Sequence, residues 1–277
     1  MRRIKKFTVF LLLLCLLLNL AGCAAAQKPL RVTLVLKTVT EVAEFWGTLL
    51  SGVEKAAEEY GVELKVLTSP REIDIDKQIE LIRQVTADKP DVMILSAADY
   101  DRCAEATEEA IAAGIGVVAI DTDVNAAGRA CFVGSNSYEI GLEMGRAMAS
   151  YLPEGGKVAV IQHMLTTTTG IERTRGVLDA LNEAGNIEIL GSFCCDNSTE
   201  QAQTITTELL SADPEIRGFV CTNEVCNVGA ANALVELGMG GRVYVVGCDN
   251  SQRQIQFLEQ NIPILPVNLV LHHLPLM

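Results

Sequence analysis

The chain has 277 residues, of which 49% are hydrophobic, 21% are charged and only 5% are aromatic. This apolar fraction is enough for the packed core of one large domain or two ordinary ones, which excludes disorder as the main state. The formal net charge of −13 argues against a nucleic-acid partner, because an acidic surface repels phosphate groups.

The N-terminus has the pattern of an export signal. Four basic residues occur among the first six, and the uncharged apolar stretch 7–22 follows them. That stretch is shorter than the roughly 20 residues of a spanning helix and ends in small residues. We therefore interpret residues 1–22 as a secretory signal peptide rather than a retained membrane anchor.

The end of this segment, Leu20-Ala21-Gly22-Cys23, resembles the lipobox at which bacterial lipoprotein signal peptides are cleaved. In such proteins the cysteine carries diacylglycerol and becomes the mature N-terminus, and two acyl chains anchor a protein firmly. The resemblance predicts a lipidated Cys23, a tether over residues 23–29 and a position on the extracytoplasmic face of the cell membrane. The alternative is that Cys23 is an incidental small residue.

Short β-branched runs then alternate with amphipathic segments. Strands are predicted at 31–37, 62–68, 91–96, 116–121, 157–162, 187–193, 217–222 and 242–249. Helices are predicted from about Val42 to Gly61 and at 74–88, 101–113, 137–151, 171–184, 199–211 and 224–237. Near-continuous apolar strands that alternate with helices are typical of α/β folds with parallel sheets covered on both faces.

This alternation is interrupted once, by a polar loop and the short run CFVGSN at 131–136. An extra short strand at this point suits a chain that passes from one α/β lobe to another. We predict two doubly wound parallel-sheet lobes joined by a hinge, with the N-terminal lobe at 30–123 and the C-terminal lobe at 124–261.

The cysteines that follow Cys23 give no sign of a metal or cofactor. There are seven of them, an odd number, so they cannot all pair internally, and several lie in apolar runs. None has the spacing of a zinc site. We interpret them as buried thiols.

Several segments occur in order and together resemble the type I periplasmic sugar-binding proteins, the ribose- and galactose-binding receptors of ABC transporters. They are EFWGTLLSGVEKAAEEYGVELKV, GVVAIDTDV, FVGSNSYEIGLEMGRAMASYL, ERTRGVLDAL, VCTNEVCNVGAANAL and VVGCDNSQ. The resemblance runs from about Leu30 to Asn261. It implies a monomeric receptor that closes on a sugar in the crevice between its lobes, outside the carboxyl ends of the strands.

In the first lobe the resemblance implies three ligand contacts. Phe45 and Trp46 would stack on the apolar face of a sugar ring, and Asp121, at a strand end, would accept hydrogen bonds from adjacent hydroxyls. The alternatives stay open. The aromatic residues could only attach their helix to the core, and Asp121 could be a solvated turn residue.

In the second lobe the implied contacts are Arg173, Asn223 and Asp249. Asn223 and Asp249 could instead be only the N-caps of the helices that follow them, and Arg173 could only brace the polar loop before it. Thr122 and Ile171 stand where the family carries arginines, so the pocket is expected to be less cationic than a ribose site.

The segment 262–277 is uncharged, with three prolines and both adjacent histidines, and differs from the acidic chain before it. Proteins of the family continue here with a further hinge crossing, but the residues of this segment do not match theirs. Asn268 falls roughly where the family has a ligand-contacting glutamine. We interpret it as an atypical tail left by truncation or a frameshift. The alternative is a divergent final strand that ends early.

No nucleophile elbow, metalloprotease, phosphate-loop or dinucleotide motif is present, and nothing around the Asp121 and Asp249 carboxylates favours a glycosidase couple. We therefore predict a binding protein rather than an enzyme. It would be a lipid-anchored receptor that delivers a sugar or related polyol to an ABC transporter permease. The alternatives are a sensor that presents its ligand to a histidine kinase or chemoreceptor, and a non-functional truncated copy.

Overall fold

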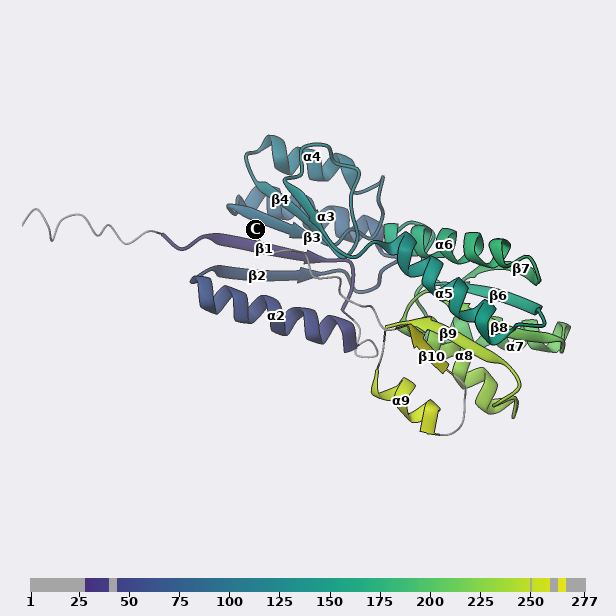
Figure 1. Cartoon of the computed structure of the whole chain (residues 1–277). Coiled ribbons are helices and arrows are strands. Elements are labelled where there is room, and N and C mark those ends of the chain that lie inside the picture. Colours follow the sequence, from purple (N-terminus) through teal and green to yellow (C-terminus); the bar gives the residue numbers. More distant parts are fainter. Residues whose placement is uncertain (1–27, 40–43, 250, 260–263, 268–277) are drawn as a thin grey trace, which may run out of the picture.

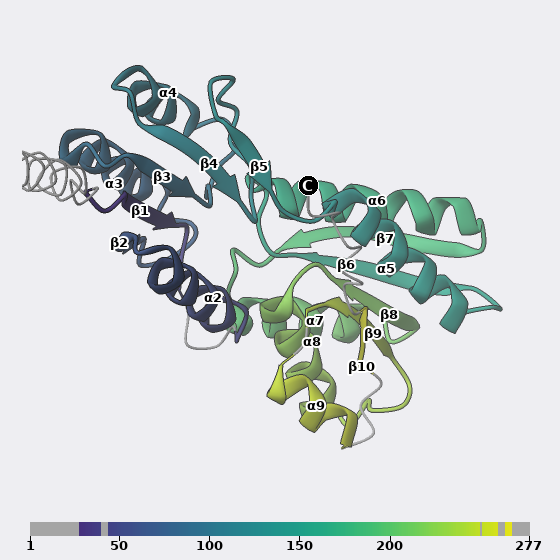
Figure 2. The same cartoon turned by 60° about the vertical axis from the view of Figure 1, so that its left-hand side comes forward.

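The computed structural model describes residues 28–39, 44–249, 251–259 and 264–267. Within these ranges the chain forms two five-stranded sheets, and every pair of neighbouring strands is parallel. The sheets lie in separate lobes (Figures 1 and 2). The predicted pair of doubly wound parallel-sheet lobes is therefore confirmed. No helix in the described part of the chain is long and apolar enough to cross a membrane.

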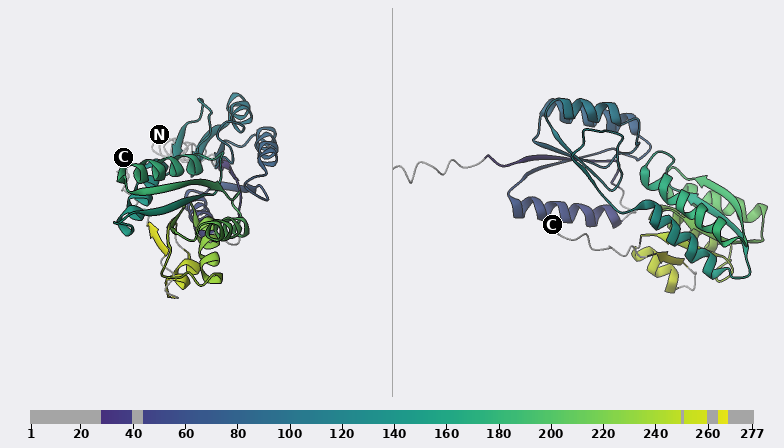
Figure 3. Two further views of the ribbon diagram at one scale, coloured as in Figure 1. Left: turned by 90° about the vertical axis from the view of Figure 1, so that its right-hand side faces the viewer. Right: turned by 45° about the horizontal axis from the view of Figure 1, so that its top comes forward.

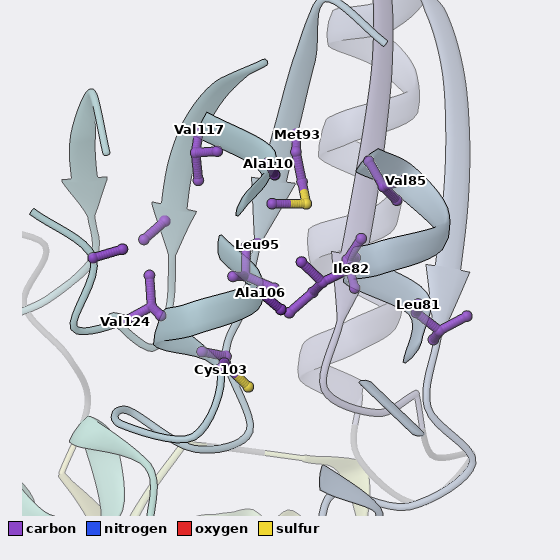
Figure 4. Close-up of a cluster of buried hydrophobic side chains, with 14 of the residues drawn as sticks. Leu81, Ile82, Val85, Met93, Leu95, Cys103, Ala106, Ala110, Val117 and Val124 are labelled. Carbon is purple, nitrogen blue, oxygen red and sulfur yellow. The ribbon is translucent and has the colours of Figure 1, made fainter. Parts of the chain in front are cut away.

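The N-terminal lobe has the strand order β2-β1-β3-β4-β5. Its strands are β1 (Arg31–Leu36), β2 (Glu63–Thr68), β3 (Val92–Leu95), β4 (Gly116–Ile120) and β5 (Cys131–Val133), and its helices are α2 (Glu44–Tyr60), α3 (Ile75–Asp88) and α4 (Ala104–Ala112). Helix α2 covers one face of the sheet, while α3 and α4 cover the other (Figure 3). Figure 4 shows the apolar core under α3 and α4, where Ile82, Val85, Met93 and Leu95 pack together.

The C-terminal lobe has the order β10-β9-β8-β6-β7. Its strands are β6 (Gly156–Gln162), β7 (Ile187–Cys194), β8 (Ile216–Cys221), β9 (Tyr244–Cys248) and β10 (Ile264–Val267), and its helices are α5 (Ser137–Tyr151), α6 (Thr168–Ala184), α7 (Thr199–Ala212), α8 (Glu224–Glu236) and α9 (Gln252–Glu259). One core cluster joins the sheet to α5 and α6, and another joins it to α7 and α8. Both faces of the sheet are thus buried, as the apolar strands require.

The short strand β5 lies past the predicted lobe boundary at residues 123–124, yet it pairs with β4 of the first sheet. Because it extends the N-terminal sheet, we propose that the chain crosses between lobes after Val133 and before α5 begins at Ser137.

Part of the segment interpreted as an atypical tail extends the second sheet. Strand β10 pairs in parallel with β9, with Pro266 opposite Gly247. Proline lacks a backbone N–H and is tolerated here because β10 is an edge strand. Residues 260–263 and 268–277, with Asn268 and the paired histidines among them, lie outside the described residues.

Five of the seven cysteines after Cys23 are buried free thiols, as predicted. Cys194 is only partly buried, and Cys131 is exposed. The prediction is wrong for Cys131 because β5 is an edge strand whose three residues are all exposed. Cys15 and Cys23 lie outside the described residues.

Helices α5 and α6 pack closely because glycines lie where they cross. A Cβ atom on Gly141 of α5 would overlap the carbonyl oxygen of Arg173, and one on Gly176 of α6 would overlap that of Tyr138. We expect Gly141→Ala to destabilise the protein by about 1–3 kcal/mol, because the two helices must move apart. The measurement is the denaturant midpoint of unfolding.

A matched control for this prediction is Gly52→Ala in α2, where a Cβ atom would meet nothing within 4 Å. Alanine favours a helix over glycine by up to about 1 kcal/mol, so this variant should be unchanged or slightly stabilised. Equal behaviour of the two variants would contradict the close-packing argument.

Candidate ligand-binding cleft

A cavity lined mainly by polar side chains lies between the lobes. It is lined by side chains from both: Lys37, Phe45, Trp46, Glu72, Asp121, His163, Thr169, Arg173, Asn197, Asn223, Glu224, Val225 and Asp249. Most of these residues follow the carboxyl end of a parallel strand or begin the next helix, which is where ligands bind in open α/β sheets. Within the described residues, no group of three or more His, Cys, Asp or Glu side chains is arranged to hold a metal ion.

All six residues predicted to contact a ligand line this one cavity: Phe45, Trp46, Asp121, Arg173, Asn223 and Asp249. The structure therefore brings together side chains that are up to 204 positions apart in the sequence. Asp121 and Asp249 both adopt the left-handed backbone conformation, with φ of 60° and 67°. Non-glycine residues seldom do so, and such residues cluster at binding and active sites.

The two aromatic residues differ in how deeply they are buried, which bears on whether each packs in the core or faces a ligand. Trp46 is only 5% exposed and packs against Leu34 and Leu36, so it belongs to the core as well as to the cavity wall. Phe45 is 37% exposed. Their rings meet edge to face, with centroids 5.0 Å apart. Trp46 therefore attaches its helix to the core. The ring of Phe45 is more exposed and lines the cavity.

The first-lobe side of the cavity contains a buried ion cluster that the sequence analysis did not identify. The Lys37 ammonium lies 3.0 Å from a Glu72 oxygen and 3.3 Å from Asp121 Oδ2, and the Lys37 side chain is 5% exposed. Burial alone would lower the pKa of Lys37, but attraction to Asp121 and Glu72 outweighs it and raises that pKa. Ser96 donates a further hydrogen bond to Asp121, at 3.2 Å. Asp121 is therefore held in place rather than solvated.

A chain of hydrogen bonds connects the lobes across the cavity. Asn223 donates to Asn197 Oδ1 at 2.8 Å, and Asn197 donates to Glu72 Oε2 at 2.8 Å. Asn223 Oδ1 also accepts from the backbone N–H of Cys226, so Asn223 is the N-cap of α8. Asn223 therefore caps its helix and lines the cavity at the same time.

The N-cap alternative for Asp249 is wrong. Helix α9 begins at Gln252, and the side chain of Ser251 accepts from the backbone N–H of Gln254. Ser251 thus occupies the capping position. The Asp249 side chain lines the cavity instead, and its Oδ1 accepts a hydrogen bond from Cys248 Sγ at 3.5 Å.

Arg173 is 8% exposed and donates from Nη1 to the backbone carbonyl of Thr222 at 2.8 Å. It thus braces the end of β8 rather than the polar loop before α6. Its buried Nε has no hydrogen-bond partner among the described residues, so this N–H remains available to a ligand.

His163 is buried beside Arg173 and is held between two threonine hydroxyls. Its Nδ1 lies 2.7 Å from Thr222 Oγ1, and its Nε2 lies 3.2 Å from Thr169 Oγ1. Burial, together with the positive charges of Lys37 and Arg173, holds the pKa of His163 well below its ordinary value. The ring is therefore a neutral part of the wall at physiological pH.

Sequence analysis missed seven of the lining residues: Lys37, Glu72, His163, Thr169, Asn197, Glu224 and Val225. Lys37 and His163 directly follow β1 and β6, so their position at strand ends was a usable signal. Glu72 and Asn197 lie inside loops and not directly after a strand, and no local pattern identifies them.

Two parallel α/β lobes with one polar cavity between them define a two-lobed solute-binding protein. The family described as periplasmic binding protein domain matches residues 33–262. Because this match covers most of the chain, the protein belongs to that family, and the predicted resemblance is confirmed.

Relatives and solved structures agree with this. The D-ribose/D-allose-binding protein of Pseudomonas aeruginosa is 27% identical, over 82% of this chain and 72% of its own. The D-allose-binding periplasmic protein of Escherichia coli is 26% identical, over 84% of this chain and 76% of its own. The crystal structure of a sugar transporter from Clostridium phytofermentans superimposes with a TM-score of 0.77, at 27% identity and 85% coverage of each chain. The named relatives are binding proteins, which confirms the prediction that the chain is not an enzyme.

Proposed function

We propose that the protein captures a sugar or related polyol between its lobes and delivers it to the permease of an ABC transporter. The observation that carries this proposal is the cavity that both lobes line, with an aromatic wall and several hydrogen-bonding side chains. A carbohydrate needs this combination, because it has an apolar C–H face and a rim of hydroxyl groups. The sugars named for the relatives support the same class of ligand.

Five of the six predicted residues have a direct role in this proposal. The exposed ring of Phe45, backed by Trp46, stacks on the apolar face of the sugar. The carboxylates of Asp121 and Asp249 accept hydrogen bonds from hydroxyls, and the free Nε of Arg173 donates one. Closure of the lobes around the ligand then signals the permease.

The proposal includes a lipid anchor. Residues 1–27, which contain the signal peptide and Cys23, lie outside the described residues, so the support is the lipobox-like sequence before Cys23. Diacylglycerol on Cys23 would hold a monomeric receptor at the extracytoplasmic face of the membrane, beside its transporter.

The test is thermal unfolding of the purified full chain in mild detergent, followed by tryptophan fluorescence, with and without individual sugars. A ligand at a thousand times its Kd adds about 4 kcal/mol to the free energy of unfolding, which raises Tm by several degrees. We expect at least one of ribose, allose and galactose to do so.

The same melt tests the site. Asp249→Asn should remove most of the sugar-induced shift, because the carboxylate accepts from hydroxyls more strongly than an amide. The matched control is Asp76→Asn, whose carboxylate is 85% exposed and lies outside the cavity. The proposal fails if no sugar or polyol moves Tm of the unaltered chain, and the site assignment fails if both variants keep the shift.

A further inference from the structure

The charges that line the cavity do not balance. Four carboxylates but only two cationic side chains face it: Glu72, Asp121, Glu224 and Asp249 against Lys37 and Arg173. The remaining basic group, His163, is neutral because its pKa is held well below its ordinary value. The side chains that line the site therefore carry more negative than positive charge, and a buried charge is costly unless it is paired.

The two cations are already engaged away from Glu224. Lys37 pairs with Glu72 and Asp121, and Arg173 donates to the backbone carbonyl of Thr222. Among the ion pairs within the described ranges, none involves Glu224. Neither Glu224 nor Asp249 forms an ion pair among the described residues, but Asp249 Oδ1 accepts a hydrogen bond from Cys248 Sγ at 3.5 Å.

Glu224 is also buried and unsatisfied. It is the first residue of α8, it is 2% exposed, and neither of its carboxylate oxygens has a hydrogen-bond partner in the described part of the chain. The side chain of Ser251 and the backbone amide of Glu44 lie near enough to favour the charged form of Glu224, but neither makes a well-aligned hydrogen bond with it. An unpaired buried carboxylate that lines a cavity indicates a ligand group that would satisfy it.

The charged groups that face Glu224 are Asp249, after β9, and Glu44, at the start of α2. Both are acidic, so they repel a second negative charge and attract a positive one. Phe45, the residue after Glu44, lines the same cavity with its ring partly exposed, and the face of an aromatic ring also attracts cations.

We infer that Glu224 is a specificity-determining residue that selects a ligand bearing a protonated amine, such as an amino sugar or an aminated polyol. This inference rests on the proposed function and narrows its ligand class. An ammonium group offers three donors and a positive charge, so it both satisfies the oxygens of Glu224 and neutralises the excess charge. A hydroxyl offers one donor and leaves the charge in place.

The test compares matched ligands by calorimetric titration of the full chain at about pH 7.5. The pairs are D-glucosamine with D-glucose, D-galactosamine with D-galactose, and 1-amino-1-deoxy-D-sorbitol with D-sorbitol. The N-acetyl derivatives are added because they keep the nitrogen but lose its charge. We expect the amine of at least one pair to bind about tenfold more tightly than its neutral parent and its N-acetyl form, since charge-assisted hydrogen bonds are about twice as strong as neutral ones.

Glu224→Gln should reduce this preference to about one, while Glu236→Gln, an exposed glutamate at the other end of the same helix, should keep it. If sugars or polyols bind but no amine binds more tightly than its neutral parent in any of the three pairs, the inference is overturned and the proposed function stands. If the preference persists in Glu224→Gln, the assignment to Glu224 is overturned. If no sugar, polyol or amine binds at all, the proposed function fails, and the inference fails with it.

Discussion

Replacing Lys37 with methionine is expected to destabilise the protein by about 3–5 kcal/mol and to abolish ligand binding. Lys37 is buried, and its ammonium is the partner of both Glu72 and Asp121. Removing one member of a buried ion pair leaves uncompensated charge in a medium of low polarity, which costs far more than the pair itself contributes. Methionine keeps most of the side-chain volume, so the loss of charge, rather than a cavity, is measured. The readout is the free energy of unfolding from denaturant titration.

The chain offers a matched control in the same lobe. Lys65 lies 2.6 Å from Asp88, closer than Lys37 lies to either partner, but both side chains are exposed by two fifths or more. Exposed pairs contribute only about 0–1 kcal/mol, so Lys65→Met should change stability little. Adding Glu72→Gln to Lys37→Met should recover part of the loss, because one unpaired charge is then removed. If Lys37→Met and Lys65→Met lowered the free energy of unfolding by similar amounts, burial would not explain the contribution of the Lys37 ion pairs to stability.

Much of the fold could be predicted because its strands are buried on both faces. A strand such as β1, with five of its six residues buried, has to be a continuous apolar run, and the amphipathic segments between such runs have to be helices. The start of α6 was harder to place. The run of threonines before it resembles a loop, yet α6 begins at Thr168, because Thr167 Oγ1 accepts a hydrogen bond from the backbone N–H of Gly170. A capping residue that is followed by further polar residues leaves no periodic signal.

The residues of the candidate site that directly follow a strand could be predicted from the sequence. The contacts that form between the two lobes could not. Asp121 and Asp249 directly follow β4 and β9, so topology alone places them at one edge of each sheet. The pairing of Asn197 with Glu72 joins loops that are 125 positions apart in the sequence. Nothing local to either residue encodes that contact, because it exists only once both lobes have folded and meet.

The second large effect is expected at Glu224, where stability without ligand should depend on pH. Desolvation by burial, helped by the repulsion of Asp249 and Glu44, raises the pKa of Glu224 from 4.5 to about 7. Between those pH values the folded chain holds a proton that the unfolded chain has released, so the free energy of unfolding falls as pH rises. For this one group the fall is about 2–3 kcal/mol and is complete by about pH 8.

Glu224→Gln removes the titration, so the difference in stability between the variant and the unaltered chain should change with pH. The two should be close at about pH 5, where Glu224 is protonated, and the variant should be the more stable by about 2–3 kcal/mol at about pH 8. Denaturant titrations at both pH values measure this difference, and Glu236→Gln, exposed on the same helix, should show none. A constant difference between Glu224→Gln and the unaltered chain would mean that the carboxylate is already satisfied. A difference that grows with pH would show that Glu224 becomes an unpaired charge as it ionises, and that a cationic ligand would recover this free energy on binding.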